Sequence, residues 1–191
     1  MSSVKVSAIL LAAGLSRRMG EDKLLLTYRE STLLQRSVNL MSKLPVYERI
    51  LVTTETRLES VTLPIGIKAC INCFPEHGLS SSVRIGVEEA TGTHYLFLVA
   101  DQPKLDLIDI LQILKSINDN PDKIIFPVID SKPGSPTVFP AVTRPELLKV
   151  TGDEGGRTIR DAHPELCFAI EPEHPKHFID IDSFEDYTNL N

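Results

Sequence analysis

The hydrophobic positions of this chain follow two spacings that alternate from the N-terminus to residue 129. Short runs of apolar and β-branched residues are typical of buried strands, and apolar residues at every third or fourth position are typical of helices. The runs predict strands at residues 4–11, 50–53, 67–71, 94–100 and 123–129. The helical spacing predicts helices at residues 33–41, 81–90 and 105–117, with Ser31 as the N-cap of the first. Such alternation predicts an α/β fold of three α/β/α layers, with a mostly parallel, Rossmann-like sheet.

The pattern changes after residue 129, where prolines and glycines interrupt it. The prolines lie at position 127, within the last predicted strand, and at 133, 136, 140 and 145 after it, and the glycines lie at 152, 155 and 156. This part is short for a separate domain, and we interpret it as an irregular extension of the same sheet that closes over a site. We therefore expect residues 1–191 to form a single domain.

Composition narrows the functional classes. Hydrophobic residues make up 42% of the chain and charged residues 24%, which is typical of globular domains. The longest apolar run falls short of the roughly 18 residues that a membrane-spanning helix needs. The formal net charge of −6 differs from the basic excess of proteins that bind nucleic acids. We expect neither a membrane nor a nucleic acid as a partner.

The cysteines and histidines predict no metal centre. Cys70, Cys73 and Cys167 are odd in number and too few for a disulfide framework, which favours a reducing, cytoplasmic location. Cys70 and Cys73 form a C-x-x-C pair, but no second pair completes a tetrahedral zinc site, so we expect ordinary cysteines at a strand end. The histidines at 77, 94, 163, 174 and 177 show no ligand spacing.

The segment L-A-A-G-L-S-R-R-M-G-E-D-K, residues 11–23, carries the strongest candidate chemistry. It follows the first strand, and ligands of open α/β sheets bind at the carboxyl ends of strands. Small residues at 12–14 let the backbone approach a ligand, and Gly20 can adopt a positive φ. Consecutive amides can hold phosphate oxygens, assisted by nearby cations. The cations are Arg17, Arg18 and Lys23. The segment is neither a Walker A loop nor G-x-G-x-x-G, and from the residues alone a solvated surface turn stays an alternative.

The same segment resembles the signature L-A-[AG]-G-x-S-x-R-M-G-x-x-K of a family of small nucleotidyltransferases that includes the molybdenum cofactor guanylyl- and cytidylyltransferases. Every fixed position of that signature is filled. The resemblance implies a nucleotide-diphospho-sugar transferase-like fold and a loop that holds a nucleoside triphosphate. The implied nucleotide-binding residues are Leu11, Ala12, Ala13, Gly14, Ser16, Arg17, Arg18 and Lys23. Ala13 gives the form Leu-Ala-Ala-Gly, which goes with the cytidylyltransferase branch, whereas Leu-Ala-Gly-Gly goes with the guanylyl branch.

Two later segments resemble further elements of this family. Residues 78–86 resemble G-x-S-x-S-[LV]-R-x-G, which implies that Ser80 and Ser81 lie beside the nucleotide base. Taken alone, they read equally well as a plain helix N-terminus. Residues 99–103 resemble the family's A-D-Q-P element, in which the aspartate, here Asp101, is a metal ligand. A carboxylate at a strand end can hold Mg²⁺, although it can also cap the next helix.

The second half resembles the family at three places. Residues 133–139 and 152–157 resemble its P-x-G-x-P and G-D-x-G-[AG]-R elements, although structural turns explain both segments equally well. The implied residues for the second substrate are Gly134, Pro136, Gly155, Gly156 and Arg157. Residues 179–187 resemble D-I-D-x-x-E-D-[LY], which implies Asp182 as a second metal ligand. Asp180, on the same face of a regular strand, is the alternative.

The resemblance extends over residues 4–187 and implies a Mg²⁺-dependent enzyme that moves CMP from CTP to the terminal phosphate of molybdopterin, with release of pyrophosphate. The implied catalytic residues are Lys23, Arg18 and Asp101. Another base or acceptor, such as GTP or a sugar phosphate, is an alternative. So is a carrier without catalysis that brings the cofactor to a molybdenum hydroxylase. A transient contact with such a hydroxylase is compatible with either function, and the oligomeric state stays open.

Overall fold

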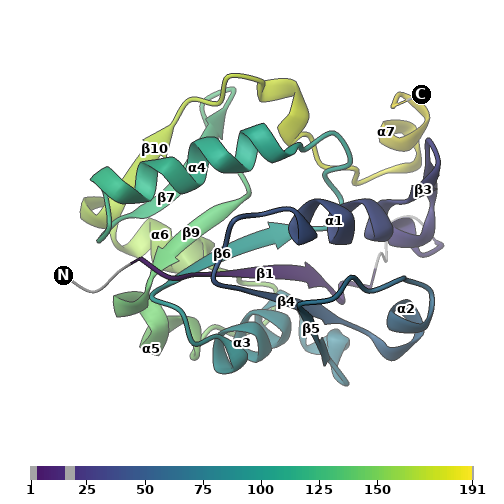
Figure 1. The fold of residues 1–191 in the computed structure, drawn as a ribbon, viewed down its shortest axis with the longest axis horizontal. Coiled ribbons are helices and arrows are strands. Elements are labelled where there is room, and N and C mark those ends of the chain that lie inside the picture. Colours follow the sequence, from purple (N-terminus) through teal and green to yellow (C-terminus); the bar gives the residue numbers. More distant parts are fainter. Residues whose placement is uncertain (1–3, 16–19, 191) are drawn as a thin grey trace.

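The computed structural model describes residues 4–15 and 20–190 and places helices on both faces of a mostly parallel sheet (Figure 1). The strands of this sheet are β1 (Val6–Ala12), β4 (Glu48–Thr53), β5 (Ile67–Ile71), β6 (His94–Val99), β7 (Ile124–Ile129), β8 (Lys132–Pro133), β9 (Thr137–Pro140) and β10 (Cys167–Ile170). A small second ribbon consists of β2 (Thr27–Tyr28) and β3 (Ser31–Thr32). The three-layer fold predicted from the sequence is confirmed.

The helices cover both faces of the sheet. The α-helices are α1 (Leu33–Ser42), α2 (Glu55–Glu59), α3 (Leu79–Glu89), α4 (Leu107–Asp119), α5 (Arg144–Leu147), α6 (Arg157–Ala162) and α7 (Phe184–Thr188). Short 3₁₀ helices are η1 (Lys23–Leu25), η2 (Pro75–His77), η3 (Ala141–Thr143), η4 (Pro164–Leu166) and η5 (Pro175–Phe178). In Figure 1, α1 and α4 lie above the sheet, and α3 and α5 lie below it.

The order of the strands creates a crevice at β1. The sheet runs β10-β7-β9-β6-β1-β4-β5, and β8 pairs with β7. From the carboxyl end of β1 the chain passes through α1 to β4 on one side, and from the carboxyl end of β6 it passes through α4 to β7 on the other side. The connections therefore diverge at the carboxyl ends of β1 and β6, which is where open α/β sheets bind ligands.

The core explains why β1 is hydrophobic on both faces. Ala8 and Leu10 pack into the cluster that includes residues of α1 and α4, whereas Ile9 between them packs into the cluster that includes residues of α3, α5 and α6. Alternate side chains of a strand point to opposite faces, so a strand covered on both sides must be apolar throughout. The register sets Ile9 beside Ile50 of β4 and Phe97 of β6.

Two details refine the predictions from the sequence. The N-cap of α1 is Thr32, whose hydroxyl accepts a hydrogen bond from the Gln35 amide (3.1 Å), so the prediction of Ser31 was wrong. Ser31 instead pairs with Tyr28 in the β2-β3 ribbon, which holds it in an extended conformation.

The irregular second half does extend the main sheet, because β9 pairs with β6 and β7, and β10 pairs with β7.

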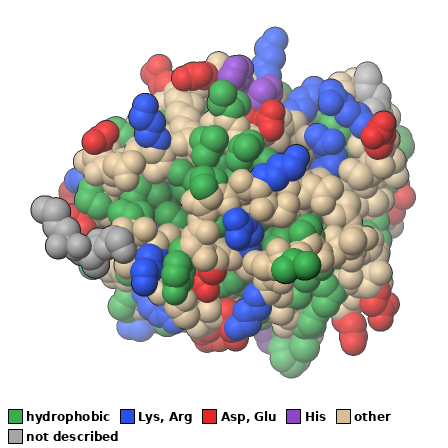
Figure 2. All heavy atoms as spheres, in the orientation of Figure 1, with side chains coloured by type: hydrophobic (Ala, Val, Ile, Leu, Met, Phe, Trp, Pro, Cys, Tyr) green, Lys and Arg blue, Asp and Glu red, His purple; other side chains and the backbone are tan. Residues whose placement is uncertain are grey.

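The surface carries charges of both signs. Figure 2 shows acidic, basic and hydrophobic side chains interspersed over the face seen in Figure 1. Within the described ranges, the structure contains no helix that is both long enough and apolar enough to cross a membrane.

Candidate active site

A cavity of about 500 Å³ opens at the carboxyl ends of β1 and β6. Its wall is formed by segments that are far apart in the sequence. They include Leu11, Ala13 and Gly14 at and after the end of β1, Pro75 to Leu79 and Ser82 around η2 and α3, Val99 to Asp101 at and after the end of β6, and Gly152, Asp153 and Asp182 from the second half. The cavity therefore lies at the point where the strand connections diverge, and five of the predicted sequence elements border it.

Lys23 and two carboxylates meet at this cavity. The Lys23 ammonium donates to Asp101 Oδ2 (2.7 Å) and to the Ile181 carbonyl (2.8 Å), and it lies 3.4 Å from Asp182 Oδ1. Burial alone would lower the pKa of Lys23, but the charges and hydrogen bonds of the two aspartates together outweigh it and raise this pKa above its usual range. Lys23 therefore carries a full positive charge at neutral pH.

The C-terminal segment brings Asp182 to Lys23. The Ile181 amide donates to the Asp101 carbonyl (2.9 Å), which joins this segment to the end of β6. The Ile181 side chain is buried against Tyr28 and Leu33, close to the chain that follows Lys23. Two residues separated by 159 positions thus share one edge of the cavity.

Asp101 has a second oxygen that suits a hard cation. Its Oδ1 atom is buried and has no hydrogen-bond partner in the part of the chain that the structure describes. A buried carboxylate oxygen without a partner is costly, because its desolvation is not offset. With Asp182 alongside, the donor set is oxygen only, as Mg²⁺ and Mn²⁺ prefer.

Asp180 differs from Asp182 in its surroundings. Asp182 borders the cavity and contacts the Lys23 ammonium. Asp180 keeps solvent-exposed surface, but burial of its carboxyl and then the nearby Asp101 charge raise its pKa to about 6. Because Asp182 borders the cavity beside the Lys23 ammonium, it is the better placed of the two aspartates to hold a cation.

Arg57, which the sequence analysis did not single out, anchors both ends of the loop between β1 and η1. Its guanidinium donates to the carbonyls of Ala12 and Gly14 (both 2.7 Å) and to both carboxylate oxygens of Asp22 (2.7 and 2.8 Å). Asp22 in turn accepts from the Leu24 amide at the start of η1. In the sequence Arg57 is one charge among several in a short helix, so its role depends on the tertiary structure.

Comparison with known proteins identifies the family. Residues 8–166 match the family model described as the MobA-like NTP transferase domain. The chain belongs to this family. It is a nucleotidyltransferase.

Relatives of this nucleotidyltransferase agree with the match. The chain is 27% identical over 191 residues to the molybdenum cofactor cytidylyltransferase of Escherichia coli K12, covering 95% of this chain and 93% of that protein. It is 29% identical over 123 residues to a protein of Rhodopirellula baltica named "Probable molybdenum cofactor guanylyltransferase", covering 61% and 58%. Among solved structures, Rv0371c of Mycobacterium tuberculosis has the same fold, with a TM-score of 0.79 at 20% identity over 99% of this chain and 98% of that chain.

One wall of the nucleotidyltransferase cavity forms where two motif segments touch. Gly78 has a φ of 85°, and a Cβ atom there would overlap the Gly152 carbonyl. The same carbonyl accepts from the Ser80 amide (3.0 Å) at the first turn of α3. Residues 78–86 and 152–157 therefore lie side by side, which the sequence motifs alone did not indicate.

Three buried serines lie at the start of α3. Ser80 and Ser81 are buried, and Ser81 Oγ accepts from Asn72 Nδ2 (2.8 Å) and donates to the Gly78 carbonyl (2.8 Å). Ser82, which also accepts from Asn72, borders the cavity. The predicted contact of Ser80 and Ser81 with the base stays a prediction.

The residues predicted for the second substrate lie outside the lining of the cavity. A Cβ atom on Gly155 would meet the Leu79 side chain, and one on Gly156 would overlap the Phe139 ring, so packing accounts for both glycines. The Arg157 side chain is exposed, and its Nε atom lies 3.5 Å from Asp161 Oδ2. The roles of these residues and of Gly134 and Pro136 stay predictions.

Gln102, the residue after Asp101, connects the end of β6 to two segments that come later in the chain. It is buried, and its side-chain amide donates to the carbonyls of Ser135 and Phe178 (both 3.2 Å).

Three predicted loop residues, Ser16, Arg17 and Arg18, lie outside the described residues. Their predicted contacts with the triphosphate stay predictions.

Proposed function

We propose that this nucleotidyltransferase moves CMP from CTP to the terminal phosphate of molybdopterin and releases pyrophosphate. The observation that carries the proposal is the meeting of Lys23, Asp101 and Asp182 at the cavity where the strand connections diverge. The Escherichia coli cytidylyltransferase supports the choice of substrates, because it is similar over 95% of this chain. Ala13, which borders the cavity, gives the Leu-Ala-Ala-Gly form that favours CTP.

Asp101 and Asp182 would hold the Mg²⁺ ion that we assign to this reaction. The buried Asp101 Oδ1 without a partner among the described residues supports the fit. Rv0371c, which shares the fold, has been solved in complex with manganese, with a TM-score of 0.77 at 18% identity over 99% of this chain and 98% of that chain. A bound Mg²⁺ would neutralise charge on the phosphates of the substrate.

The remaining chemistry requires positioning and positive charge from the protein. An oxygen of the acceptor phosphate attacks the α-phosphorus of the triphosphate, and the bond to pyrophosphate breaks. We assign to Lys23, together with Arg18, the stabilisation of the charge that builds up on the leaving pyrophosphate. The loop amides that follow β1 orient the phosphates, and Arg57 holds that loop in place. No protein nucleophile is required.

GTP is the second candidate for the nucleotide, because the Rhodopirellula relative is named as a guanylyltransferase. The carrier hypothesis explains the site less well, because a carrier needs no cation held beside two carboxylates. Contact with a recipient molybdenum hydroxylase is compatible with either nucleotide and belongs to the same proposal.

Pyrophosphate release from each of the four ribonucleoside triphosphates, with Mg²⁺ and molybdopterin, tests the proposal. Release with CTP alone, reduced at least about 100-fold in Asp101→Asn, is the expected result. Asp119→Asn is the matched control, since Asp119 is an exposed aspartate at the end of α4. Release with GTP alone would assign the guanylyl reaction. No release from any triphosphate that still binds would favour the carrier and overturn the proposal.

A further inference from the structure

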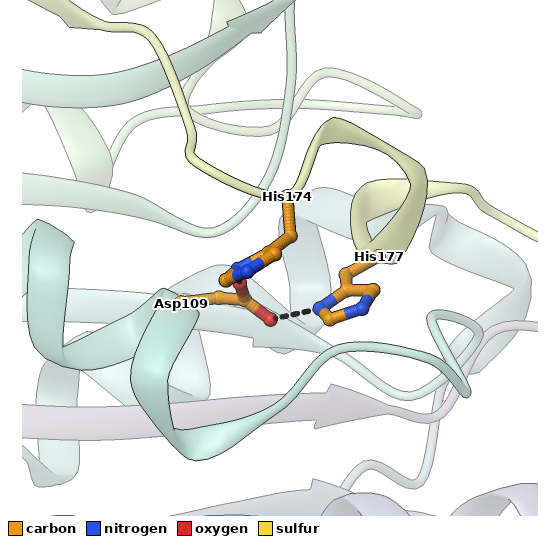
Figure 3. Close-up of side chains that lie close together, drawn as sticks. All are labelled: Asp109, His174 and His177. Carbon is orange, nitrogen blue, oxygen red and sulfur yellow. Dashed lines mark hydrogen bonds and ion pairs between the residues drawn. The ribbon is translucent and has the colours of Figure 1, made fainter.

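Two histidines and an aspartate meet on the face of the sheet covered by α4, outside the cavity lining (Figure 3). Asp109 lies in the first turn of α4, His174 precedes η5, and His177 lies within it. His174 Nδ1 is 3.3 Å from Asp109 Oδ1, and His177 Nδ1 is 2.9 Å from Asp109 Oδ2. The spacing of the histidines in the sequence did not indicate this cluster, because its third member lies 65 positions before His174 in the chain.

The spacing of the donor atoms suits a metal ion. One nitrogen from each histidine and one carboxylate oxygen lie within 4.8 Å of one another. Zinc binds nitrogen and oxygen at about 2.0–2.2 Å, so ligands of a tetrahedral ion lie about 3.3–3.6 Å apart. The two observed nitrogen–oxygen distances, 3.3 and 2.9 Å, are close to that spacing. Two imidazoles with one carboxylate suit zinc and its neighbours among the transition metals, whereas magnesium prefers oxygen alone.

The burial of Asp109 provides an independent reason for a cation at this place. Its side chain is 1% exposed, and its Oδ2 also accepts from the Asp106 amide (2.9 Å) in the capping box of α4. A buried carboxylate is stabilised by hydrogen bonds and by positive charge, and a divalent ion would add the positive charge that two neutral imidazoles do not supply.

The histidines leave a path for an ion to enter. Their side chains are 46% and 35% exposed, and their rings are stacked with centroids 4.9 Å apart. In Figure 2 histidine side chains reach the surface at the upper edge of this face, where the chain after β10 passes α4. Water can therefore reach the site and complete the coordination of an ion.

We propose that Asp109, His174 and His177 bind one divalent transition-metal ion of the zinc class, with water as the remaining ligand. The ion fastens η5 to α4. From η5 the chain continues to the cavity. Two hydrogen bonds attach it there: the Phe178 carbonyl accepts from the Gln102 side-chain amide, and the Ile181 amide donates to the Asp101 carbonyl. The ion therefore stabilises the segment that carries Asp182. This inference does not depend on the nucleotide or acceptor of the enzyme.

Calorimetric titration of the chelator-treated protein with ZnCl₂ tests the proposal. The titration uses an Asp101→Asn, Asp182→Asn background, so that the cavity carboxylates do not contribute. We expect one zinc ion per chain. His174→Ala and His177→Ala should each weaken binding at least about 10- to 100-fold, since loss of even an outer-shell partner of a metal has that effect. His163→Ala, at another histidine that contacts carboxylates, should bind as the background does.

Two further measurements separate ligation from a structural role. Co²⁺ should give visible absorption typical of nitrogen and oxygen ligands, lost on addition of Zn²⁺ and missing in His177→Ala. His177→Gln keeps a hydrogen-bonding group without an imidazole, so it should retain the melting temperature of the metal-free protein and lose the stabilisation by Zn²⁺. Unchanged zinc affinity in both histidine variants, or the same loss in His163→Ala, would overturn the proposal. So would a failure of the unsubstituted protein to bind Zn²⁺.

Discussion

Replacing Arg57 with methionine removes a guanidinium that ties both ends of the candidate nucleotide loop to α2. The substituted side chain keeps much of the apolar stem but none of the donors to Ala12, Gly14 and Asp22. Arg57 is only 4% exposed, so water cannot replace these donors without opening the structure. The two described ends of the loop should therefore lose their fixed positions relative to the cavity.

The magnitude follows from the four hydrogen bonds, all between 2.7 and 2.8 Å. Hydrogen bonds to charged groups contribute about 1.5–3 kcal/mol each, but bonds from one guanidinium are not additive, and breaking a buried ion pair costs about 3–5 kcal/mol in total. Asp22 is 32% exposed and can regain water, which reduces the cost. We expect a loss of about 2–4 kcal/mol in the free energy of unfolding.

Nucleotide affinity should fall in the same variant, because a triphosphate must then order the loop as it binds. We expect the Kd for the preferred triphosphate to rise about 10- to 100-fold, which corresponds to about 1.4–2.7 kcal/mol. Urea unfolding measures the first quantity, and calorimetric titration with the triphosphate measures the second.

Arg49→Met is the matched control. Arg49 also donates to two carbonyls, those of Met41 and Leu44, but it lies near the start of β4 while the cavity lies at the other end of the sheet. This variant should lose stability and keep its nucleotide affinity. If Arg57→Met loses stability but binds the triphosphate as tightly as Arg49→Met does, Arg57 only supports the fold, and the positioning role is refuted.

Three further changes test other parts of the structure. Lys23→Met should lower kcat at least about 100-fold in a pyrophosphate-release assay at a temperature where the variant is folded, and retained turnover would exclude Lys23 from the chemistry. Glu48→Gln tests pH dependence: burial acts to raise the pKa of Glu48, but hydrogen bonds, first that from Ser7 Oγ (2.6 Å), lower it overall. A lowered pKa in the folded state stabilises the protein above the usual glutamate pKa of about 4.3. The variant should therefore be less stable at neutral pH, by about 0.5–1 kcal/mol because solvent screens this partly exposed group. The difference should disappear as acidification protonates the folded carboxylate. A difference in urea unfolding that does not change with pH would contradict this account. Gly156→Ala should cost about 1–3 kcal/mol because its Cβ overlaps the Phe139 ring, and Phe139→Leu in the same chain should recover part of that loss; no recovery would place the strain elsewhere.

The local pattern of hydrophobic residues was sufficient to predict most strands of the sheet. The strand predicted at 67–71 matches β5 at both ends, and the other predicted strands overlap β1, β4, β6 and β7. Strands that are buried on both faces must be apolar throughout, so the pattern reports them directly. The ends of helices depend on less local information. Thr32, not Ser31, caps α1 because the helix begins at Leu33, directly after Thr32, and the exact first residue of a helix is not encoded in the hydrophobic spacing.

The principal cavity residues could also be predicted. Lys23 and Asp101 follow strands whose carboxyl ends lie side by side in a parallel sheet, so a strand-end motif indicates where they meet. Asp182 was assigned through its motif, and its approach to Lys23 depends on the packing of the C-terminal segment beside Tyr28 and Leu33.

The sequence by itself determined which segments are buried, in what order they alternate, and which strand ends carry chemical groups. Only the tertiary structure decided which distant polar groups share a site. Arg57 of α2 donates hydrogen bonds to the loop after β1, and Gln102 donates to the segment that contains Ser135. Asp109 contacts two histidines that lie more than 60 positions later in the chain. The physical reason is that burial is recorded residue by residue in hydrophobicity, whereas a hydrogen bond or a ligand set depends on the relative placement of elements that no local pattern encodes.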